Sequence, residues 1–132
     1  MIHKVKLQTG KHEQMLDITA QVQDIVNKEK VTEGLVLVYC PHTTAAITIN
    51  ENADPDVVHD ILRRLEEVYP WNHPLDHHGE GNSAAHLKAS TIGSSELILL
   101  DKGNLVLGTW QGIYFCEFDG PRQRNYYVKI QQ

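Results

Sequence analysis

The sequence has no long apolar run, no excess of positive charge and very little cysteine. No apolar stretch approaches the roughly 20 residues that a bilayer-spanning helix requires, and the first ten residues are too polar for a signal peptide. The net charge of -5 and the lack of a Lys/Arg run argue against nucleic acid held on a broad basic surface. We therefore predict a soluble cytoplasmic protein that has neither a membrane nor a nucleic acid as its partner.

The two cysteines, Cys40 and Cys116, lie in separate apolar stretches and do not form a Cys-x-x-Cys motif. We expect buried free thiols rather than a disulfide or a catalytic nucleophile. A serine-hydrolase nucleophile motif is also absent, and Ser83 has no evident catalytic partners in the sequence. Nucleophilic catalysis by a side chain is therefore not expected.

The composition of the chain predicts one domain over residues 1–132. Hydrophobic residues make up 41% of the chain, which is enough to form one core. Alternating and continuous apolar stretches predict strands, and periods near 3.6 predict helices. The expected strands lie near residues 5–7, 16–18, 35–40, 44–50, 96–100, 105–110, 113–118 and 125–132, and the expected helices begin at Thr19, at Pro55 and after Asn82. We predict an α+β fold, a compact β-sandwich-like sheet with two or three helices.

Two of these elements carry specific expectations. Asp54 precedes Pro55 and an apolar stripe, which is typical of a capped helix start. The strand at 35–40 is apolar at every position, so we expect both of its faces to be buried.

The most polar and chemically dense stretch is residues 76–88, DHHGEGNSAAHLK, which contains three histidines, a glutamate, an asparagine and two glycines. Gly79 and Gly81 allow backbone conformations that approach a ligand closely. Asn82 is a typical N-cap, and good helix formers follow it. The stretch therefore predicts a loop that leads into a helix, with imidazoles for a metal ion or backbone amides for an anion.

His42, at a predicted turn between two strands, is the third candidate histidine. If His42 meets His78 and His86 in space, the three imidazoles would form a metal site with open positions for water or substrate. A hydrogen-bonded anion site is the alternative, and His77 competes with His78 as the ligand. The remaining histidines are expected to be structural or exposed: His3, His12, His59 and His73.

Glu80, which lies among the histidines, is the first candidate for general acid/base catalysis. Arg122 follows Gly-Pro in a predicted turn, where it could bind a phosphate or carboxylate, or form a salt bridge with Glu117 or Asp119.

Trp110 and Gln111 lie in another predicted strand, where the indole could stack on a heteroaromatic ring and the amide beside it could recognise that ring. A core tryptophan is the alternative interpretation.

Three long segments of the chain resemble the corresponding segments of a known family. The phrases PHTTAAITINENADPDV from residue 41, HHGEGNSAAHLKAS from residue 77 and GTWQGIYFCEFDGPR from residue 108 occur in this order. They resemble the YjbQ-like family, also called the secondary thiamine-phosphate synthase family. The resemblance implies a homotrimer with a cleft at or near the subunit contacts. It also implies a site formed by His42, His78 and His86, surrounded by Glu80, Asn82, Trp110, Gln111 and Arg122; His77 stands where the family pattern does not require histidine.

The resemblance further implies an activity, which joins a pyrimidine diphosphate to a thiazole phosphate and releases diphosphate. For this activity we expect Glu80 and His86 as catalytic residues and His42, His78 and His86 as ligands of a divalent metal, Zn or Mg. The expected substrate-binding residues are Gly81, Asn82, Trp110, Gln111 and Arg122.

Two alternatives remain open from the sequence. One is a metal-dependent hydrolase of a small phosphorylated or acyl compound, in which Glu80 is the base that activates a metal-bound water. The other is a non-catalytic ligand-binding or scaffold trimer.

Overall fold

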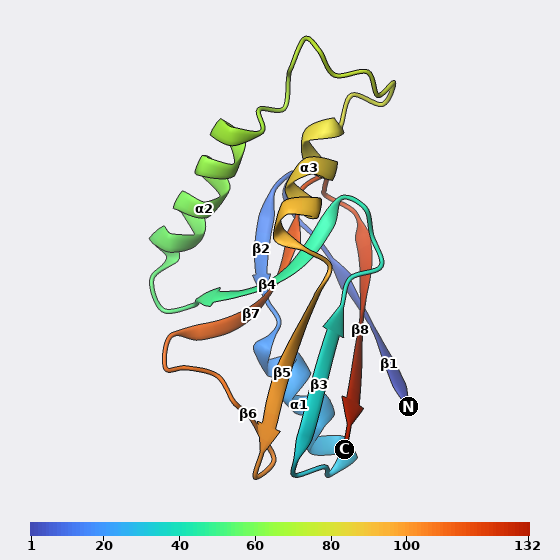
Figure 1. The fold of residues 1–132 in the computed structure, drawn as a ribbon, viewed down its shortest axis with the longest axis vertical. Helices are drawn as coiled ribbons and strands as arrows, with labels where there is room; N and C mark the ends of the chain where they lie inside the picture. The colour runs from blue at the N-terminus through green and yellow to red at the C-terminus, as the bar shows by residue number, and fades with distance from the viewer.

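A computed structural model describes residues 1–132 as two antiparallel sheets and three helices (Figure 1). The elements in chain order are β1 (Ile2–Gln8), β2 (Gln14–Asp17), α1 (Thr19–Glu29), β3 (Gly34–Tyr39), β4 (Ala45–Glu51), α2 (Pro55–Val68), α3 (Ser83–Ile92), β5 (Ser95–Asp101), β6 (Asn104–Leu105), β7 (Gln111–Glu117) and β8 (Gln123–Gln131). The larger sheet has the strand order β1-β8-β3-β5-β6, and the smaller sheet has the order β2-β7-β4. This architecture confirms the predicted α+β fold.

The main core lies between the two sheets and α1. The larger sheet contributes alternate residues, such as Val36 and Val38 of β3, while β7 contributes Ile113 and Phe115. Side chains of a strand point alternately to its two faces, so each strand of the larger sheet offers only every second residue to this core. Cys40 and Cys116 are both buried and free, as the sequence predicted.

The other face of the larger sheet is not covered by any element of the chain. Leu35, Leu37 and Tyr39 of β3 point to this side, together with Leu97 and Leu99 of β5, which are 60% and 61% exposed. We call these five residues the outer face. The prediction that both faces of residues 35–40 are buried was therefore wrong for a single chain, because the helices pack elsewhere.

The helices begin largely where the sequence signals place them. Asp54 caps α2 by accepting a hydrogen bond from the Asp56 backbone N–H at 2.9 Å, and Pro55 occupies the first turn. α2 contains no fully buried residue, and no helix is long and apolar enough to cross a membrane. α3 packs on β4 and is buried more deeply, with four buried residues, Ala84, Ala85, Lys88 and Ala89. α3 is therefore the most firmly placed helix near the polar stretch.

The predicted strand over 105–110 is mostly irregular. Asn104–Leu105 pairs with β5, the Val106 N–H donates to the Leu99 carbonyl of β5 at 2.8 Å, and the chain then turns before β7. Gln111 closes this turn because its backbone N–H donates to the Gly108 carbonyl at 3.1 Å, while its side-chain oxygen accepts from the Gly108 N–H at 2.7 Å. The turn competes with strand pairing for the same backbone groups.

Candidate functional site

The loop between α2 and α3 rises beyond both sheets at the N-terminal end of α3 (Figure 1). There the rings of His78 and His86 meet edge to face, with their centroids 5.4 Å apart. Both rings line a surface hollow of about 460 Å³, which we call the histidine hollow. Its lining residues are Leu75, Asp76, His77, His78, Ser83, His86 and Leu87. The structure thus brings together two of the three predicted histidines, and His77 lies beside them.

A second hollow, of about 410 Å³, lies on the other side of His78. Its lining includes Trp71, Gly81 and the Asp76 and His78 that also line the histidine hollow. The Trp71 ring meets the His12 ring edge to face at a centroid distance of 4.4 Å. Sequence reasoning missed both residues, because only the folded loop places them beside the site.

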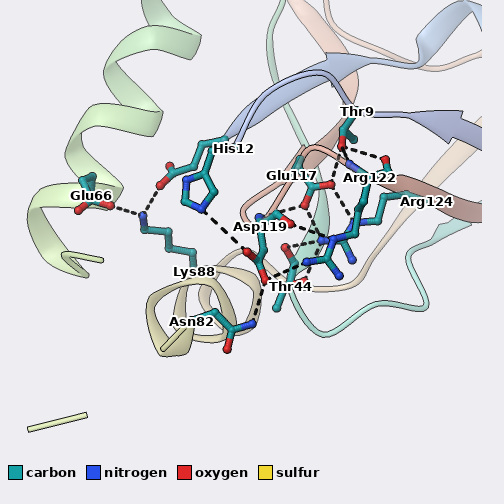
Figure 2. A network of polar contacts seen from close by, with 11 residues as sticks. Thr9, His12, Thr44, Glu66, Asn82, Lys88, Glu117, Asp119, Arg122 and Arg124 are labelled. Carbon is teal, nitrogen blue, oxygen red and sulfur yellow. Dashed lines mark hydrogen bonds and ion pairs between the residues drawn. The ribbon is translucent and has the colours of Figure 1, made fainter. Parts of the chain in front are cut away.

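Asn82 stands at the N-cap of α3, as predicted, but its side chain does not cap the helix. Its Nδ2 donates to Asp119 Oδ2 at 2.8 Å (Figure 2). The side-chain oxygen, Oδ1, is buried and has no hydrogen-bond partner within the chain, although Asn82 is only 7% exposed. Unsatisfied buried acceptors are rare, so this atom is available to a donor on a bound molecule or to water.

Asp119 also fixes the orientation of Arg122. The Arg122 Nη2 donates to Asp119 Oδ2 at 3.1 Å, and its Nε donates to the Asp119 carbonyl at 2.9 Å. The salt bridge that the sequence left as an alternative is therefore present, with Asp119 as its partner. Half of the Arg122 side chain is still exposed, so the oriented guanidinium can also bind an anion.

A buried charge pair, Glu117 of β7 and Arg124 of β8, flanks the turn between these two strands (Figure 2). Glu117 accepts hydrogen bonds from Arg124 Nε at 2.8 Å, from Thr9 Oγ1 at 2.8 Å and from the Asp119 N–H at 3.0 Å. Burial alone would raise the pKa of Glu117, but the bonds from Arg124, Asp119 and Thr9 outweigh it and hold the pKa below its usual value. The pair thus anchors the turn that carries Asp119.

A sequence signal for this pair existed. Glu117 is the single charged residue in the otherwise apolar stretch IYFCEF, where an ionised side chain needs a buried partner. The identity of the partner could not be inferred, because Arg124 lies on the next strand.

His42 does not join His78 and His86. Its Nε2 accepts a hydrogen bond from the Asn125 backbone N–H at 3.0 Å, and its ring faces Phe115 edge on. Burial, reinforced by the nearby Arg124 charge, lowers the pKa of His42, which favours the neutral ring. No group of three or more His, Cys, Asp or Glu side chains in the chain is arranged to hold a metal ion. The three-histidine arrangement that we expected is therefore not formed within one chain.

The structure also separates Trp110 and Gln111 from the histidine hollow. Gln111 begins β7, whereas the turn with Asp119 follows the end of β7, and a strand of this length spans roughly 20 Å. The Trp110 side chain is 62% exposed, so it is not a core residue either. Glu80 is exposed and lines neither hollow, although the neighbouring Gly81 lines the second.

Fold and site together define a class: a small α+β protein with two paired imidazoles at a helix N-terminus, whose N-cap asparagine shares an aspartate with an exposed arginine. Comparison with known proteins gives the particular family. Residues 3–132 match the family model described as UPF0047 protein YjbQ-like, and the chain belongs to this family.

Relatives match nearly the whole chain. The UPF0047 protein YugU of Bacillus subtilis (strain 168) is 57% identical over 130 residues, which cover 98% of each chain. A UPF0047 protein of Methanocaldococcus jannaschii is 50% identical over 132 residues, covering 98% of this chain and 94% of the relative. The crystal structure of an uncharacterized conserved YjbQ/UPF0047 protein from Clostridium acetobutylicum has a TM-score of 0.95 at 54% identity, covering 98% of this chain and 99% of that one.

Proposed function

We propose that this protein is an enzyme that binds a small phosphorylated substrate in the histidine hollow. Its most specific activity, taken from the family resemblance, is the formation of thiamine phosphate from a pyrimidine diphosphate and a thiazole phosphate. The observation that carries the proposal is the pairing of His78 and His86, with 5.4 Å between their ring centroids, beside the N-terminus of α3.

The N-terminus of α3 supports the binding of an anion. The first turn of a helix leaves backbone N–H groups without partners inside the helix, and the helix dipole places positive potential there. Ser83, the first residue of α3, lines the histidine hollow and adds a hydroxyl donor. Arg122 lines neither hollow, but it shares Asp119 with Asn82 at the start of the same helix, and its half-exposed guanidinium adds positive potential there.

These groups suit the release of diphosphate. In the proposed reaction a carbon–nitrogen bond forms to the pyrimidine part while a carbon–oxygen bond to diphosphate breaks, and the electron pair leaves with the diphosphate. Donors that are already oriented toward the leaving oxygens stabilise the charge that develops there. We assign His86 the role of donor to the leaving group, because it stands on the rigid helix α3 and because its ring keeps one N–H even if the other nitrogen holds a metal ion.

We also propose that the histidine pair holds a divalent metal, Zn or Mg. The chain alone gathers no set of three ligands, so the two imidazoles would hold the ion together with oxygens of water or of the substrate phosphates. Imidazole nitrogen suits Zn, and phosphate or water oxygen suits Mg. The ion would supply positive charge beside the substrate phosphates. His42 is not in this set, since it does not line the histidine hollow.

The direct test is turnover. Purified protein with both phosphorylated precursors should form thiamine phosphate, measured by chromatography, in the presence of Mg²⁺ or Zn²⁺. His86→Ala should reduce the rate by at least about 100-fold, the lower range for the loss of one proton-transferring side chain. His59→Ala, on an exposed histidine of α2, is the matched control and should keep the wild-type rate. Absence of product with the wild-type protein would rule out thiamine-phosphate synthesis.

We propose in addition that the protein is a homotrimer, as the resemblance implies, and that the outer face lies at the subunit contact. Exposed apolar patches on soluble proteins commonly mark such contacts. An apolar hollow of about 280 Å³, lined by Ile2, Leu37, Tyr39, Tyr127 and Lys129, lies beside the leucines. A cytoplasmic location remains part of this proposal, supported by two cysteines that are buried and unpaired.

A further inference from the structure

Lys88 is a buried cation on α3, two residues beyond His86. Its side chain is 0% exposed, and its Nζ donates to Glu13 Oε1 and to Glu66 Oε1, each at 2.7 Å (Figure 2). A buried ammonium group is tolerated only when such partners compensate for its lost hydration. Lys88 therefore ties α3 to the β1–β2 connection through Glu13 and to α2 through Glu66.

Glu66 makes one contact that Glu13 does not make. Its second oxygen, Oε2, accepts the backbone N–H of Trp71 at 2.8 Å. Trp71 stands near the start of the long loop that carries His78, just after α2 ends at Val68. The pKa of Glu66 is lowered because the hydrogen bonds from Lys88 and Trp71 outweigh the effect of burial, which alone would raise it. Glu66 is thus held ionised between the helix that bears His86 and the loop that bears His78.

The rest of the loop has few bonds to the body of the protein. Between Trp71 and Asn82 its hydrogen bonds are internal: Asp76 N–H to the His73 carbonyl, Leu75 N–H to His73 Nδ1, and Gly81 N–H to the His78 carbonyl. Every residue from 72 to 81 is exposed. The loop is therefore tethered by hydrogen bonds at its two ends. Glu66 binds Trp71 and Tyr69 binds Thr91 of α3 at 3.0 Å at the start, while Asn82 binds Asp119 at the end.

We propose that Glu66 is a positioning residue for the histidine pair. Through Lys88 it fixes the start of the loop relative to α3, and so holds His78 at the distance from His86 that lets both rings share one ligand. This inference rests on the proposed function of the histidine hollow. It adds that a glutamate outside both hollows sets the affinity of the site.

Glu13 provides a matched control, because it contacts the same Lys88 Nζ at the same distance without contacting the loop. Glu66→Ala and Glu13→Ala should both lower stability, as each leaves Lys88 with one carboxylate. Only Glu66→Ala should weaken the binding of Zn²⁺ alone or of inorganic phosphate, by roughly tenfold, a typical effect of losing a group that orients a ligand residue. Isothermal titration calorimetry measures both affinities, and thermal unfolding measures the stability of each variant.

A second readout does not depend on any ligand. In NMR spectra, the nuclear Overhauser effect between the His78 and His86 ring protons should be present in the wild type and in Glu13→Ala, and lost in Glu66→Ala. Glu66→Gln keeps an oxygen that can accept the Trp71 N–H, so it should restore much of this signal. It also serves if Glu66→Ala fails to fold.

The two proposals can fail separately. If the wild type binds neither probe but the ring contact is lost only in Glu66→Ala, the proposed function falls and the positioning role stands. If the ring contact persists in Glu66→Ala, or if Glu13→Ala loses it equally, the positioning role is overturned.

Discussion

At the scale of single residues, the site depends on which atoms are already occupied. His42 Nε2 accepts a backbone N–H from β8, so this ring is a structural acceptor and only its other nitrogen can reach a ligand. Asn82 shows the opposite case, because its Oδ1 is buried without a partner. Arg122 lies between these cases, since Asp119 orients its guanidinium and leaves half of the side chain exposed. Residue type alone does not distinguish the three.

The occupied His42 leads to a pH prediction. Because burial and Arg124 lower the pKa of His42 in the folded state, the unfolded chain takes up the proton first as the pH falls. The stability that the neutral ring contributes is complete above the unfolded pKa of about 6.5 and is lost as the pH falls from there through the folded pKa. His42→Gln removes this titration, so the free energy of unfolding should depend less on pH below about 6.5. Urea unfolding at a series of pH values measures the difference.

His59→Gln is the control for this series, because His59 is exposed on α2. It should lose stability on acidification in parallel with the wild type. Equal pH dependence of the wild type and His42→Gln would show that the His42 ring does not contribute.

At the scale of elements, the turn between β7 and β8 determines where the polar groups meet. The Gly120 N–H donates to the His12 carbonyl at 3.0 Å, and the Arg122 N–H donates to Thr9 Oγ1 at 2.9 Å. These hydrogen bonds therefore join the β1–β2 connection to this turn. As a result, Asp119 faces Asn82 at the start of α3.

Gly120 should be essential to this packing. A Cβ atom added there would lie 2.5 Å from the Lys11 backbone oxygen and 2.8 Å from Glu117 Cγ, so backbone would have to shift. We expect Gly120→Ala to lower the free energy of unfolding by about 1–3 kcal/mol, the usual cost of overpacking. Gly79→Ala is the control, because nothing lies within 4 Å of a Cβ at that position. Urea unfolding compares the two, and equal stability would contradict the close packing of this turn.

At the scale of the whole molecule, the two faces of the larger sheet differ in what covers them. One face lies on the main core, while the outer face carries leucines and a tyrosine toward solvent. The polar groups of the candidate site gather instead around the N-terminus of α3 and the β7–β8 turn. This division leaves the outer face free to contact another copy of the chain.

A charge on the outer face should break the proposed trimer. Leu37 lies opposite Leu97 in the sheet, and its side chain faces away from the core, so Leu37→Glu should fold. The wild type should sediment at about three times the 15.0 kDa chain mass, and Leu37→Glu should sediment near 15.0 kDa, because a buried unpaired carboxylate opposes association. Val68→Glu, on an exposed apolar residue of α2, should remain trimeric. A monomeric wild type would refute the trimer.

The sequence alone determined the types of most elements, the capped start of α2 at Asp54, the buried state of Cys40 and Cys116, and the family. It also indicated that His78 and His86 belong to one polar region. These features depend on neighbours close in the chain, where residue spacing sets the helical or extended period and where caps act locally. A local pattern is therefore sufficient to predict them.

The tertiary structure alone decided which distant groups meet. It placed His42 on the Asn125 N–H, paired Arg122 with Asp119, and enclosed Lys88 between two glutamates. It also places Trp110 just before β7, whereas Asp119 of the candidate site follows the other end of this strand. Such contacts depend on strand register and on how turns pack against each other, and neither property is written in the spacing of any single segment.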